Sequence, residues 1–371
     1  MNILINASNI KKGGGLQVAD SVCRELFKFP QHTFVVVLSK HFENTREALS
    51  SMPNVTTYVY DIQNSLITVL FGRDHFLDGL VRNQKVDAVL TIFGPSRWIP
   101  KVHHLSGFAQ GHIVLPDSPF WGMLPTKQRL SMKLKLWVIK QSLRKCANNY
   151  FTENPLITER LHKIFPRKRI HTVTNNVNQI FYHPDNWDRS ISLPSFNGIT
   201  LLTVAANYPH KNLKIIIPVT SWLKEHRPNL KFRFVLTIRK EDFPVIGEDI
   251  RKHIVFLGPV DISQVPYLYE QSDIMLLPTL LECFSASYAE AMLMKTPILT
   301  TDLIFAHGLC GDAALYYEAT SYEDLGNSIL RLAEDATLRE TLVTNGISQI
   351  SQFDTFEQRA KKMIEIVETM K

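Results

Sequence analysis

The fold is decided by the stretch Pro278-Thr-Leu-Leu-Glu282-Cys-Phe-Ser-Ala-Ser-Tyr-Ala-Glu290-Ala-Met-Leu-Met-Lys-Thr-Pro297. A short apolar run at residues 273–277 precedes it and has the pattern of a buried strand, and a second such run begins at Ile298. Between the two runs, the pattern predicts a loop and then a helix that starts near Ser285 or Ala286 and ends before Pro297. A strand, loop, helix and second strand in this order are typical of α/β proteins.

Two carboxylates, Glu282 and Glu290, lie eight residues apart on this corner, one in the loop and one in the second turn of the helix. Acids near a helix start are also ordinary surface residues, because the helix dipole favours negative charge there, so the spacing alone leaves both interpretations open. We expect Ser285 and Ser287 to cap the helix, whose free amides would point back into the loop and suit a phosphate.

Length and composition indicate a soluble protein of two domains. The chain has 371 residues, 45% hydrophobic and 20% charged, and contains no apolar stretch long enough to span a bilayer. Its first residues enter a strand-like run directly, without the layout of a signal peptide. Four scattered cysteines fit a reducing cytosol, and neither a disulfide framework nor a metal site is expected.

Charge is distributed unevenly along the chain. Residues 1–180 hold 23 Lys and Arg against 11 Asp and Glu, a net charge of +12, whereas residues 181–371 hold 18 against 24, a net charge of −6. Seven of the basic residues, and no acid, lie between Ser118 and Thr152. A basic first half suggests an anionic partner, which could be nucleic acid, a membrane surface or a phosphorylated substrate.

A helix predicted within this basic segment would carry one basic stripe and two apolar stripes. The basic stripe comprises Arg129, Lys133, Lys140 and Arg144. The apolar stripes comprise Met132, Leu136, Ile139 and Leu143 on one side and Leu130, Leu134, Trp137 and Val138 on the other. We expect the apolar stripes to pack in the core and the basic stripe to dock on an anionic membrane. Nucleic acid is disfavoured, because no aromatic and basic groove motif accompanies the stripe.

Strand-like apolar runs alternate with helical stretches through most of the chain, which predicts parallel sheets with helices on both faces. The runs of the first half are residues 2–6, 33–38, 55–60, 86–93, 102–109, 149–152 and 170–173. A polar segment at 181–198 interrupts the pattern and is predicted to be a linker. The runs of the second half are residues 199–205, 232–237, 254–257, 274–277, 298–300 and 314–316. We therefore expect two doubly wound α/β domains, residues 1–180 and 199–353, with ligands at the carboxyl ends of the strands.

Two further loops lead from a predicted strand into a helix and carry residues suited to a ligand. Gly13-Gly14-Gly15 follows the first strand, where a Gly-rich turn either holds a ligand or is simply tight, and the dinucleotide fingerprint is incomplete. Val204-Ala-Ala-Asn-Tyr-Pro-His-Lys211 ends the first strand of the second domain. The positive end of a helix disfavours a nearby cation, so Lys211 is better explained as a diphosphate ligand than as a solvated residue.

These segments together resemble glycosyltransferase family 4, retaining enzymes whose signature is Pro-Ser-x-x-Glu-x-Phe-Gly-x-x-x-x-Glu-Ala. Pro278, Glu282, Phe284, Glu290 and Ala291 match the signature, and Ser285 stands where the family has Gly. Residues 175–181 and 310–317 are similar to two further family segments. The resemblance implies the GT-B fold: two Rossmann-like domains that face each other across a cleft, with a C-terminal helix, residues 354–371, returning to the first domain.

The resemblance implies a donor site in the second domain. Glu282 would lie by the donor sugar, Glu290 would hold the ribose, and Lys211 matches the phosphate-binding Lys. The remaining donor-binding candidates are Phe284, Ser285, Ala286, Asn207, Gly14 and Gly15. The Arg that the family places before its Lys is absent, since Ala205 and Ala206 occupy that region, and Arg239 is a candidate substitute.

The first domain would bind the acceptor, and the family often places a His near the anomeric carbon of the donor. His112 is the candidate, with Gln110 as the alternative, and His103 and His104 lie at the other end of the same predicted strand. No Asp-x-Asp and no zinc spacing of Cys and His occur, so a metal-independent reaction is expected.

The sequence thus predicts a retaining hexosyltransferase that uses a nucleotide sugar, UDP- or GDP-linked, as its substrate and takes no cofactor. We expect a lipid-linked saccharide acceptor, as in bacterial O-antigen or capsule synthesis, and a cytoplasmic enzyme that is peripheral at the inner face of the plasma membrane. Two alternatives stay open: a GT-B nucleotide-sugar epimerase, which would convert the sugar without an acceptor, and a non-catalytic nucleotide-sugar-binding subunit. A dehydrogenase is disfavoured by the incomplete fingerprint.

Overall fold

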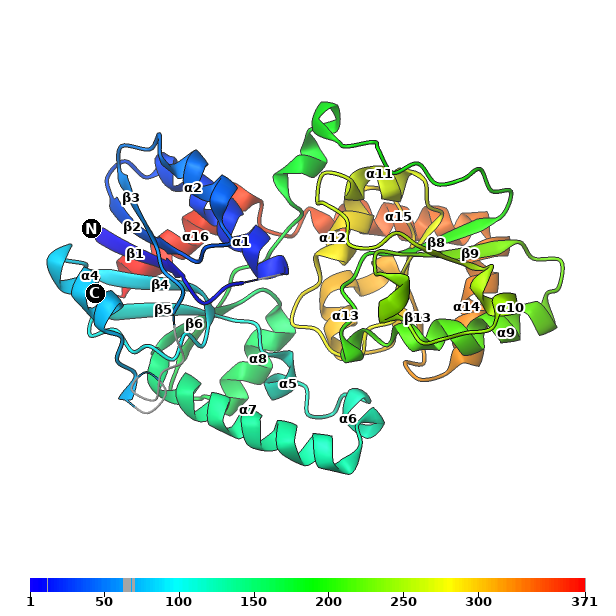
Figure 1. Ribbon diagram of the computed structural model, residues 1–371, viewed down its shortest axis with the longest axis horizontal. Helices are drawn as coiled ribbons and strands as arrows, with labels where there is room; N and C mark the ends of the chain where they lie inside the picture. Colours follow the sequence, from blue (N-terminus) through cyan, green and yellow to red (C-terminus); the bar gives the residue numbers. More distant parts are fainter. Residues whose placement is uncertain (12, 63–67, 69–70, 371) are drawn as a thin grey trace. The chain divides into compact units, whose positions relative to one another are not determined.

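The structure is a computed structural model that describes residues 1–11, 13–62, 68 and 71–370. The chain divides into two compact units, each built on one parallel sheet (Figure 1). Unit 1 comprises residues 1–116, 124–175 and 354–371, and unit 2 comprises residues 117–123 and 176–353. Two doubly wound α/β sheets are the architecture that the alternating pattern predicts.

The sheet of unit 1, within the described residues, has seven strands in the order β3-β2-β1-β4-β5-β6-β7. They are β1 (Asn2–Ala7), β2 (Thr33–Leu38), β3 (Val55–Val59), β4 (Ala88–Gly94), β5 (His103–Phe108), β6 (Asn149–Thr152) and β7 (Arg169–Thr172). Adjacent strands run parallel, and Ile3 of β1 lies opposite Phe34 of β2 on one side and Ala88 of β4 on the other. The strand order reverses between β1 and β4, which makes their carboxyl ends the topological switch point of this sheet.

Helices cover the strands of unit 1. In the described part of the chain they are α1 (Gly14–Arg24), α2 (Glu43–Leu49), α4 (His75–Asn83), α5 (Gly111–Val114), α7 (Thr126–Cys146), α8 (Pro155–Ile164) and α16 (Phe356–Thr369), with a 3-10 turn at Leu26–Lys28. Because both faces of the sheet are covered, the central strands are apolar throughout, and residues 3–7 of β1 are all buried.

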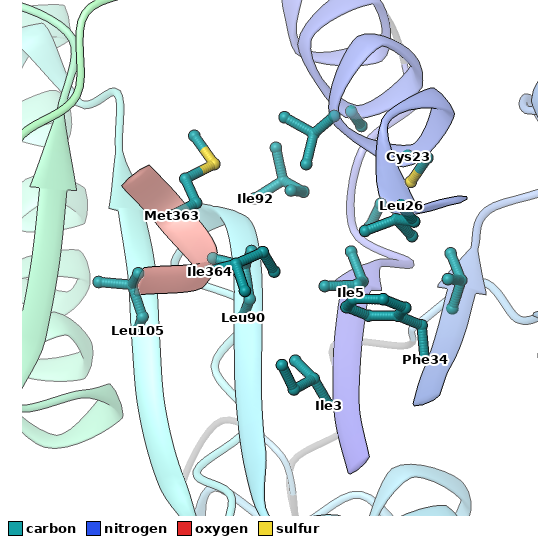
Figure 2. Packing of buried hydrophobic residues seen from close by; sticks show 14 of the residues in the cluster. Ile3, Ile5, Cys23, Leu26, Phe34, Leu90, Ile92, Leu105, Met363 and Ile364 are labelled. Atoms are coloured by element: carbon teal, nitrogen blue, oxygen red, sulfur yellow. The ribbon is translucent and has the colours of Figure 1, made fainter. Parts of the chain in front are cut away.

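The C-terminal helix α16 packs against the sheet of unit 1. Its residues Met363 and Ile364 lie in one buried cluster with Leu90 of β4 and Leu105 of β5 (Figure 2). A capping box starts the helix, because the Thr355 hydroxyl accepts from the Gln358 amide while the Gln358 side chain accepts from the Thr355 amide. The expectation that the C-terminal helix returns to the first domain is confirmed.

The sheet of unit 2, counted over the described residues, has six parallel strands in the order β10-β9-β8-β11-β12-β13. They are β8 (Ile199–Thr203), β9 (Phe232–Leu236), β10 (Ile254–Phe256), β11 (Ile274–Leu277), β12 (Ile298–Thr301) and β13 (Ala314–Tyr317). Here the order reverses between β8 and β11. The strand, loop, helix and strand predicted around residues 273–300 are β11, the Glu282 loop, α12 and β12.

The α-helices described for unit 2 are α6 (Phe120–Met123), α9 (Ile216–His226), α10 (Glu248–Arg251), α11 (Val265–Glu270), α12 (Ala286–Leu293), α13 (Ile304–Cys310), α14 (Tyr322–Glu334) and α15 (Ala336–Ile350). Its 3-10 turns are Gln179–Tyr182, Pro184–Asn186, Pro209–Lys211, Leu213–Ile215, Lys240–Asp242 and Gly311–Ala313. Between β8 and α9, Asn212 has a left-handed φ of 52° and separates the 3-10 turn Pro209–Lys211 from the turn Leu213–Ile215, which leads directly into α9.

Candidate functional site

The loops that follow β8 and β11 bring Lys211 and Glu282 together at the switch point of unit 2. The Lys211 Nζ lies 2.5 Å from the Glu282 Oε1, and their side chains are only 13% and 11% exposed. The Thr279 Oγ1 donates to the same carboxylate oxygen at 2.9 Å. Ligands bind at such a switch point in doubly wound sheets, so this ion pair occupies the place where a ligand is expected.

Glu290 forms the second half of the cluster. It lies in the second turn of α12 and is 4% exposed. Burial raises the pKa of its carboxyl to about 7, while a hydrogen bond from Tyr269 and the positive charge of Lys211 act in the opposite direction. The Tyr269 hydroxyl donates to the Glu290 Oε2 at 3.1 Å. Lys211 therefore acts electrostatically on both acids.

The first turn of α12 does not have the caps that we expected, and that prediction is wrong. Ser285 is the N-cap residue, but its hydroxyl makes no capping bond. The Ser287 hydroxyl instead donates to the Val204 carbonyl at 3.1 Å, because it faces the loop after β8. This bond holds α12 against that loop, and the amides at the helix start, from Ala286 on, are not occupied by a serine hydroxyl.

The other predicted donor-site residues of unit 2 are placed around this cluster. The Phe284 ring meets the Phe353 ring edge to face at 6.1 Å, which braces the loop beside Glu282. The Asn207 side chain donates to the Asp242 carbonyl, so it holds two loops of unit 2 together. Arg239 is exposed beyond the carboxyl end of β9, and its side chain forms no hydrogen bond or ion pair within the described residues.

Three residues of this site carried no signal in the sequence. Thr279 and Tyr269 each donate a hydrogen bond to one of the two acids. Ser118, in the short segment that unit 2 takes from the first half of the chain, donates to the Leu280 carbonyl at 2.5 Å. A single hydroxyl has no recognisable motif, and its partner depends on the tertiary fold.

The sequence profile of the family described as Glycosyl transferases group 1 matches residues 198–335 of this chain. That range contains Lys211, Glu282 and Glu290, the three charges of the cluster. Residues 198–335 belong to the group 1 glycosyltransferase family.

Known proteins agree with this assignment. The chain is 20% identical over 291 residues to the O-antigen chain mannosyltransferase RfbU of Salmonella typhimurium, which covers 76% of this chain and 75% of that protein. A glycosyltransferase structure from Rickettsia africae covers 100% of this chain and 98% of its own, with a TM-score of 0.70 at 14% identity. The structure of WaaG, a glycosyltransferase involved in lipopolysaccharide biosynthesis, has a TM-score of 0.68 at 14% identity and covers 99% of both chains. These structures establish the GT-B fold.

In unit 1 of the glycosyltransferase, the Gly-rich loop opens α1. Gly13 is the N-cap residue and has a φ of 75°, a conformation that glycine adopts without strain. A Cβ atom on Gly15 would lie 3.2 Å from Ile10, so this glycine permits close packing, whereas a Cβ atom on Gly14 would meet nothing within 4 Å. Backbone geometry and packing thus account for Gly13 and Gly15, and open space lies beside Gly14.

The histidines of unit 1 lie at opposite ends of β5. His104, near its amino end, is buried between the Thr91 hydroxyl and the Cys146 carbonyl, and burial lowers its pKa to about 4. His103 begins the same strand. His112 lies in α5, beyond the carboxyl end of β5, and Gln110 is the N-cap of that helix. The candidates His112 and Gln110 are therefore the ones at the ligand-binding edge of this sheet.

Helix α7 of the glycosyltransferase exposes one of its two apolar stripes. Leu143 is buried and Met132, Leu136 and Ile139 are half-buried, as expected. Leu130, Leu134 and Trp137, however, are 64%, 66% and 59% exposed, and Val138 is 38% exposed. The expectation that both stripes pack in the core is wrong for this second stripe, because unit 1 covers only one side of the helix. We call these four residues the α7 ridge.

The described residues contain no helix that is long and apolar enough to cross a bilayer. Among the same residues, no group of three or more His, Cys, Asp and Glu could hold a metal ion. All four cysteines are buried, and none of them forms a disulfide bond.

Proposed function

We propose that this glycosyltransferase moves a hexose from a UDP- or GDP-linked sugar onto a saccharide acceptor, with the anomeric configuration retained. The observation that carries the proposal is the cluster of Lys211, Glu282 and Glu290 at the switch point of unit 2. One cation between two acids suits a ligand that has an anionic diphosphate on one side and neutral hydroxyl groups on the other.

In this proposal, Lys211 exchanges one partner for another when the donor binds. Without a donor, its ammonium group is paired with Glu282 at 2.5 Å. A diphosphate carries more negative charge than a carboxylate and attracts the ammonium group more strongly. Lys211 and the amides at the start of α12 then stabilise the charge that develops on the leaving diphosphate. Glu282, released from the ion pair, accepts hydrogen bonds from the sugar hydroxyls and faces the cationic character of the reacting carbon.

Glu290 holds the ribose in this proposal. Its carboxylate accepts the ribose hydroxyls only when it is ionised, and its pKa of about 7 makes that state depend on pH near neutrality. Tyr269 fixes the orientation of the carboxylate through the bond of 3.1 Å to Oε2. His112 of unit 1 is our candidate for a contact with the sugar or the acceptor.

A lipid-linked saccharide is the acceptor that we propose, with the enzyme at the inner face of the plasma membrane. The names of an O-antigen chain mannosyltransferase and of a glycosyltransferase of lipopolysaccharide synthesis among its relatives support such an acceptor. The α7 ridge supports membrane docking, because exposed apolar side chains flanked by Lys133 and Arg144 are typical of helices that lie at an anionic membrane surface.

The donor site is tested by a panel of UDP-, GDP- and dTDP-linked sugars added to the full chain. We expect one donor to raise the melting temperature and to be hydrolysed slowly without acceptor. Glu290→Ala removes hydrogen bonds to a charged group, which corresponds to a loss of donor affinity of about tenfold or more. Glu340→Ala, at an exposed position of α15, is the matched control and should leave donor affinity unchanged.

Three results would contradict this proposal. If no donor raises the melting temperature, or if Glu290→Ala leaves donor affinity unchanged, the proposed donor site is wrong. Conversion of the donor to its epimer in the absence of acceptor would assign an epimerase. Donor binding without hydrolysis or transfer to any acceptor would assign a non-catalytic subunit.

A further inference from the structure

Unit 1 has a small cavity at its own switch point. It has a volume of about 190 Å³ and lies where the loops after β1 and β4 meet. Its lining residues are Asn9, Lys11, Ile62, Pro95, Ser96, Arg97 and Ile139. Pockets that enclose a whole small ligand measure roughly 300–1,000 Å³, so this cavity suits one chemical group of a larger substrate.

The charge of the cavity is positive. Lys11 and Arg97 line it, and none of the other described residues that line it is an Asp or Glu. The side chains of Lys11 and Arg97 form no hydrogen bond or ion pair with any residue that the structure describes. Two unpaired cations on adjacent loops are an arrangement that binds a phosphoryl group.

Asn9 adds a polar group that lacks a partner. Its Nδ2 donates to the Phe93 carbonyl at 2.7 Å, which fixes the side chain between the two loops. Its Oδ1 is buried and accepts no hydrogen bond from any residue in the described part of the chain. A buried acceptor without a donor is unfavourable, and a hydroxyl group next to a bound phosphoryl group would satisfy it. The cavity therefore suits a sugar phosphate better than a simple inorganic anion.

Arg97 is held in a strained backbone conformation. Its φ is 60°, in the left-handed region, where side chains other than Gly, Asn and Asp are disfavoured. Residues with such backbone strain cluster at functional sites. A glycine would adopt this conformation freely, so Arg97→Gly removes the guanidinium group without adding backbone strain.

The cavity also borders the helix that we propose for membrane docking. Ile139, which lines the cavity, lies on the half-buried side of α7, while the α7 ridge faces outward. In a saccharide that is linked to a lipid through phosphate, the phosphoryl groups lie between the sugar and the lipid chain. The lipid chain would then lie at α7, and the phosphoryl group would lie in the cavity next to that helix.

We propose that Lys11 and Arg97 bind the phosphoryl group that joins the acceptor saccharide to its lipid carrier, with the Asn9 Oδ1 accepting a sugar hydroxyl. This inference rests on the proposed function, because it names the acceptor class of the same enzyme. It assigns acceptor affinity to residues of unit 1 that are separate from the donor cluster of unit 2.

The test measures binding of geranyl diphosphate, inorganic pyrophosphate and geraniol to the full chain carrying Lys211→Ala, which weakens diphosphate binding at the donor site. We expect geranyl diphosphate to bind most tightly and geraniol to bind weakly or not at all. Lys11→Gln and Arg97→Gln should each weaken diphosphate binding about tenfold, as expected for the loss of one charge-assisted contact. Arg46→Gln, an exposed cation of α2, is the control and should have no effect.

The variant Arg97→Gly distinguishes a loss of diphosphate binding from a loss of folding stability. Glycine relieves the strain at φ 60°, so this variant should melt no lower than the parent protein while its diphosphate binding falls. Unchanged diphosphate binding in both Arg97→Gly and Lys11→Gln would overturn the proposal. Equal affinity for geranyl diphosphate and pyrophosphate would overturn the lipid linkage and assign a free diphosphate as the ligand. Because donor stabilisation through Glu290 is measured separately with Lys211 intact, failure here is distinct from failure of the donor site.

Discussion

At the scale of single residues, the ionisation of Glu290 opposes the stability of the fold. The pKa of its carboxyl in the folded protein, about 7, lies above the value of an unfolded Glu, ~4.3, because the group is buried. The folded chain therefore binds an extra proton between these two pH values. The stability that this proton contributes is fully present below the unfolded pKa and is lost as the pH rises through 7.

Glu290→Gln should accordingly stabilise the protein at alkaline pH. At pH 8 we expect the free energy of unfolding in urea to rise by up to about 3 kcal/mol, since the amide has no charge to bury. Near pH 3, below the unfolded pKa of ~4.3, the difference should vanish, because the wild-type carboxyl is then protonated in both states. Glu340→Gln serves as the exposed control. A variant that is less stable than wild type at pH 8 would show that Lys211 and Tyr269 more than offset the cost of burial.

The sequence identified the charged residues of this site but not how they are paired. Glu282 and Glu290 could be singled out by spacing and by resemblance to a family. The ion pair between Lys211 and Glu282 joins residues 71 positions apart, and it follows from the adjacency of β8 and β11 in the sheet. Strand order is decided by how helices pack on both faces, which the apolar pattern of each strand does not encode.

At the scale of the element, α7 shows what a periodic pattern leaves open. Periodicity predicted a helix with two apolar stripes, and the structure has a helix there. An apolar stripe indicates that the side chains avoid water in some state, but it does not indicate whether the protein core or another phase covers them. The α7 ridge remains exposed in the isolated chain.

The α7 ridge should govern binding to vesicles. We expect the wild-type protein to bind vesicles that contain phosphatidylglycerol more tightly than neutral ones. The double variant Leu134→Ser, Trp137→Ser should weaken that binding at least about tenfold, since each large apolar side chain contributes about 1.5–3 kcal/mol when it is buried. Co-sedimentation with vesicles measures this affinity.

Two comparisons make the vesicle experiment specific. Ile347→Ser removes an apolar side chain of α15 that is exposed like the ridge residues, with an exposed fraction of 47%. It should leave vesicle binding unchanged. Lys133→Gln with Arg144→Gln should reduce the preference for anionic lipid, because each basic residue near the surface contributes about 1 kcal/mol. Binding that depends on neither the ridge nor the anionic lipid would exclude α7 as the docking element.

At the scale of the whole molecule, the course of the chain between units was only partly predictable. The alternation of strands and helices predicted two sheets, and the resemblance to GT-B enzymes implied that the last helix returns to the first. Residues 117–123 also cluster with unit 2, and no pattern signals this. Seven residues without periodicity are too few for a sequence argument, and contacts such as the Ser118 hydroxyl to the Leu280 carbonyl decide their place.

The return of α16 makes the stability of unit 1 depend on residues at both ends of the chain. Arg359 of α16 is 2% exposed, and its guanidinium donates to Asn175, where the chain leaves unit 1. Its charge also acts on buried Glu153, whose pKa burial raises to about 7. The Thr174 hydroxyl donates to Asp354 at 2.9 Å, where the chain re-enters unit 1.

Arg359→Met should therefore destabilise unit 1 selectively. Removing the guanidinium leaves Glu153 buried without its compensating charge, which costs about 3 kcal/mol. Amide hydrogen exchange should show loss of protection in β1 and β4, while β8 and β11 keep theirs, because each unit has its own core. Lys361→Met, on the exposed side of α16, is the matched control. If protection fell equally in both sheets, the two units would unfold as one cooperative body, and the stability of the donor site in unit 2 would then depend on the C-terminal helix.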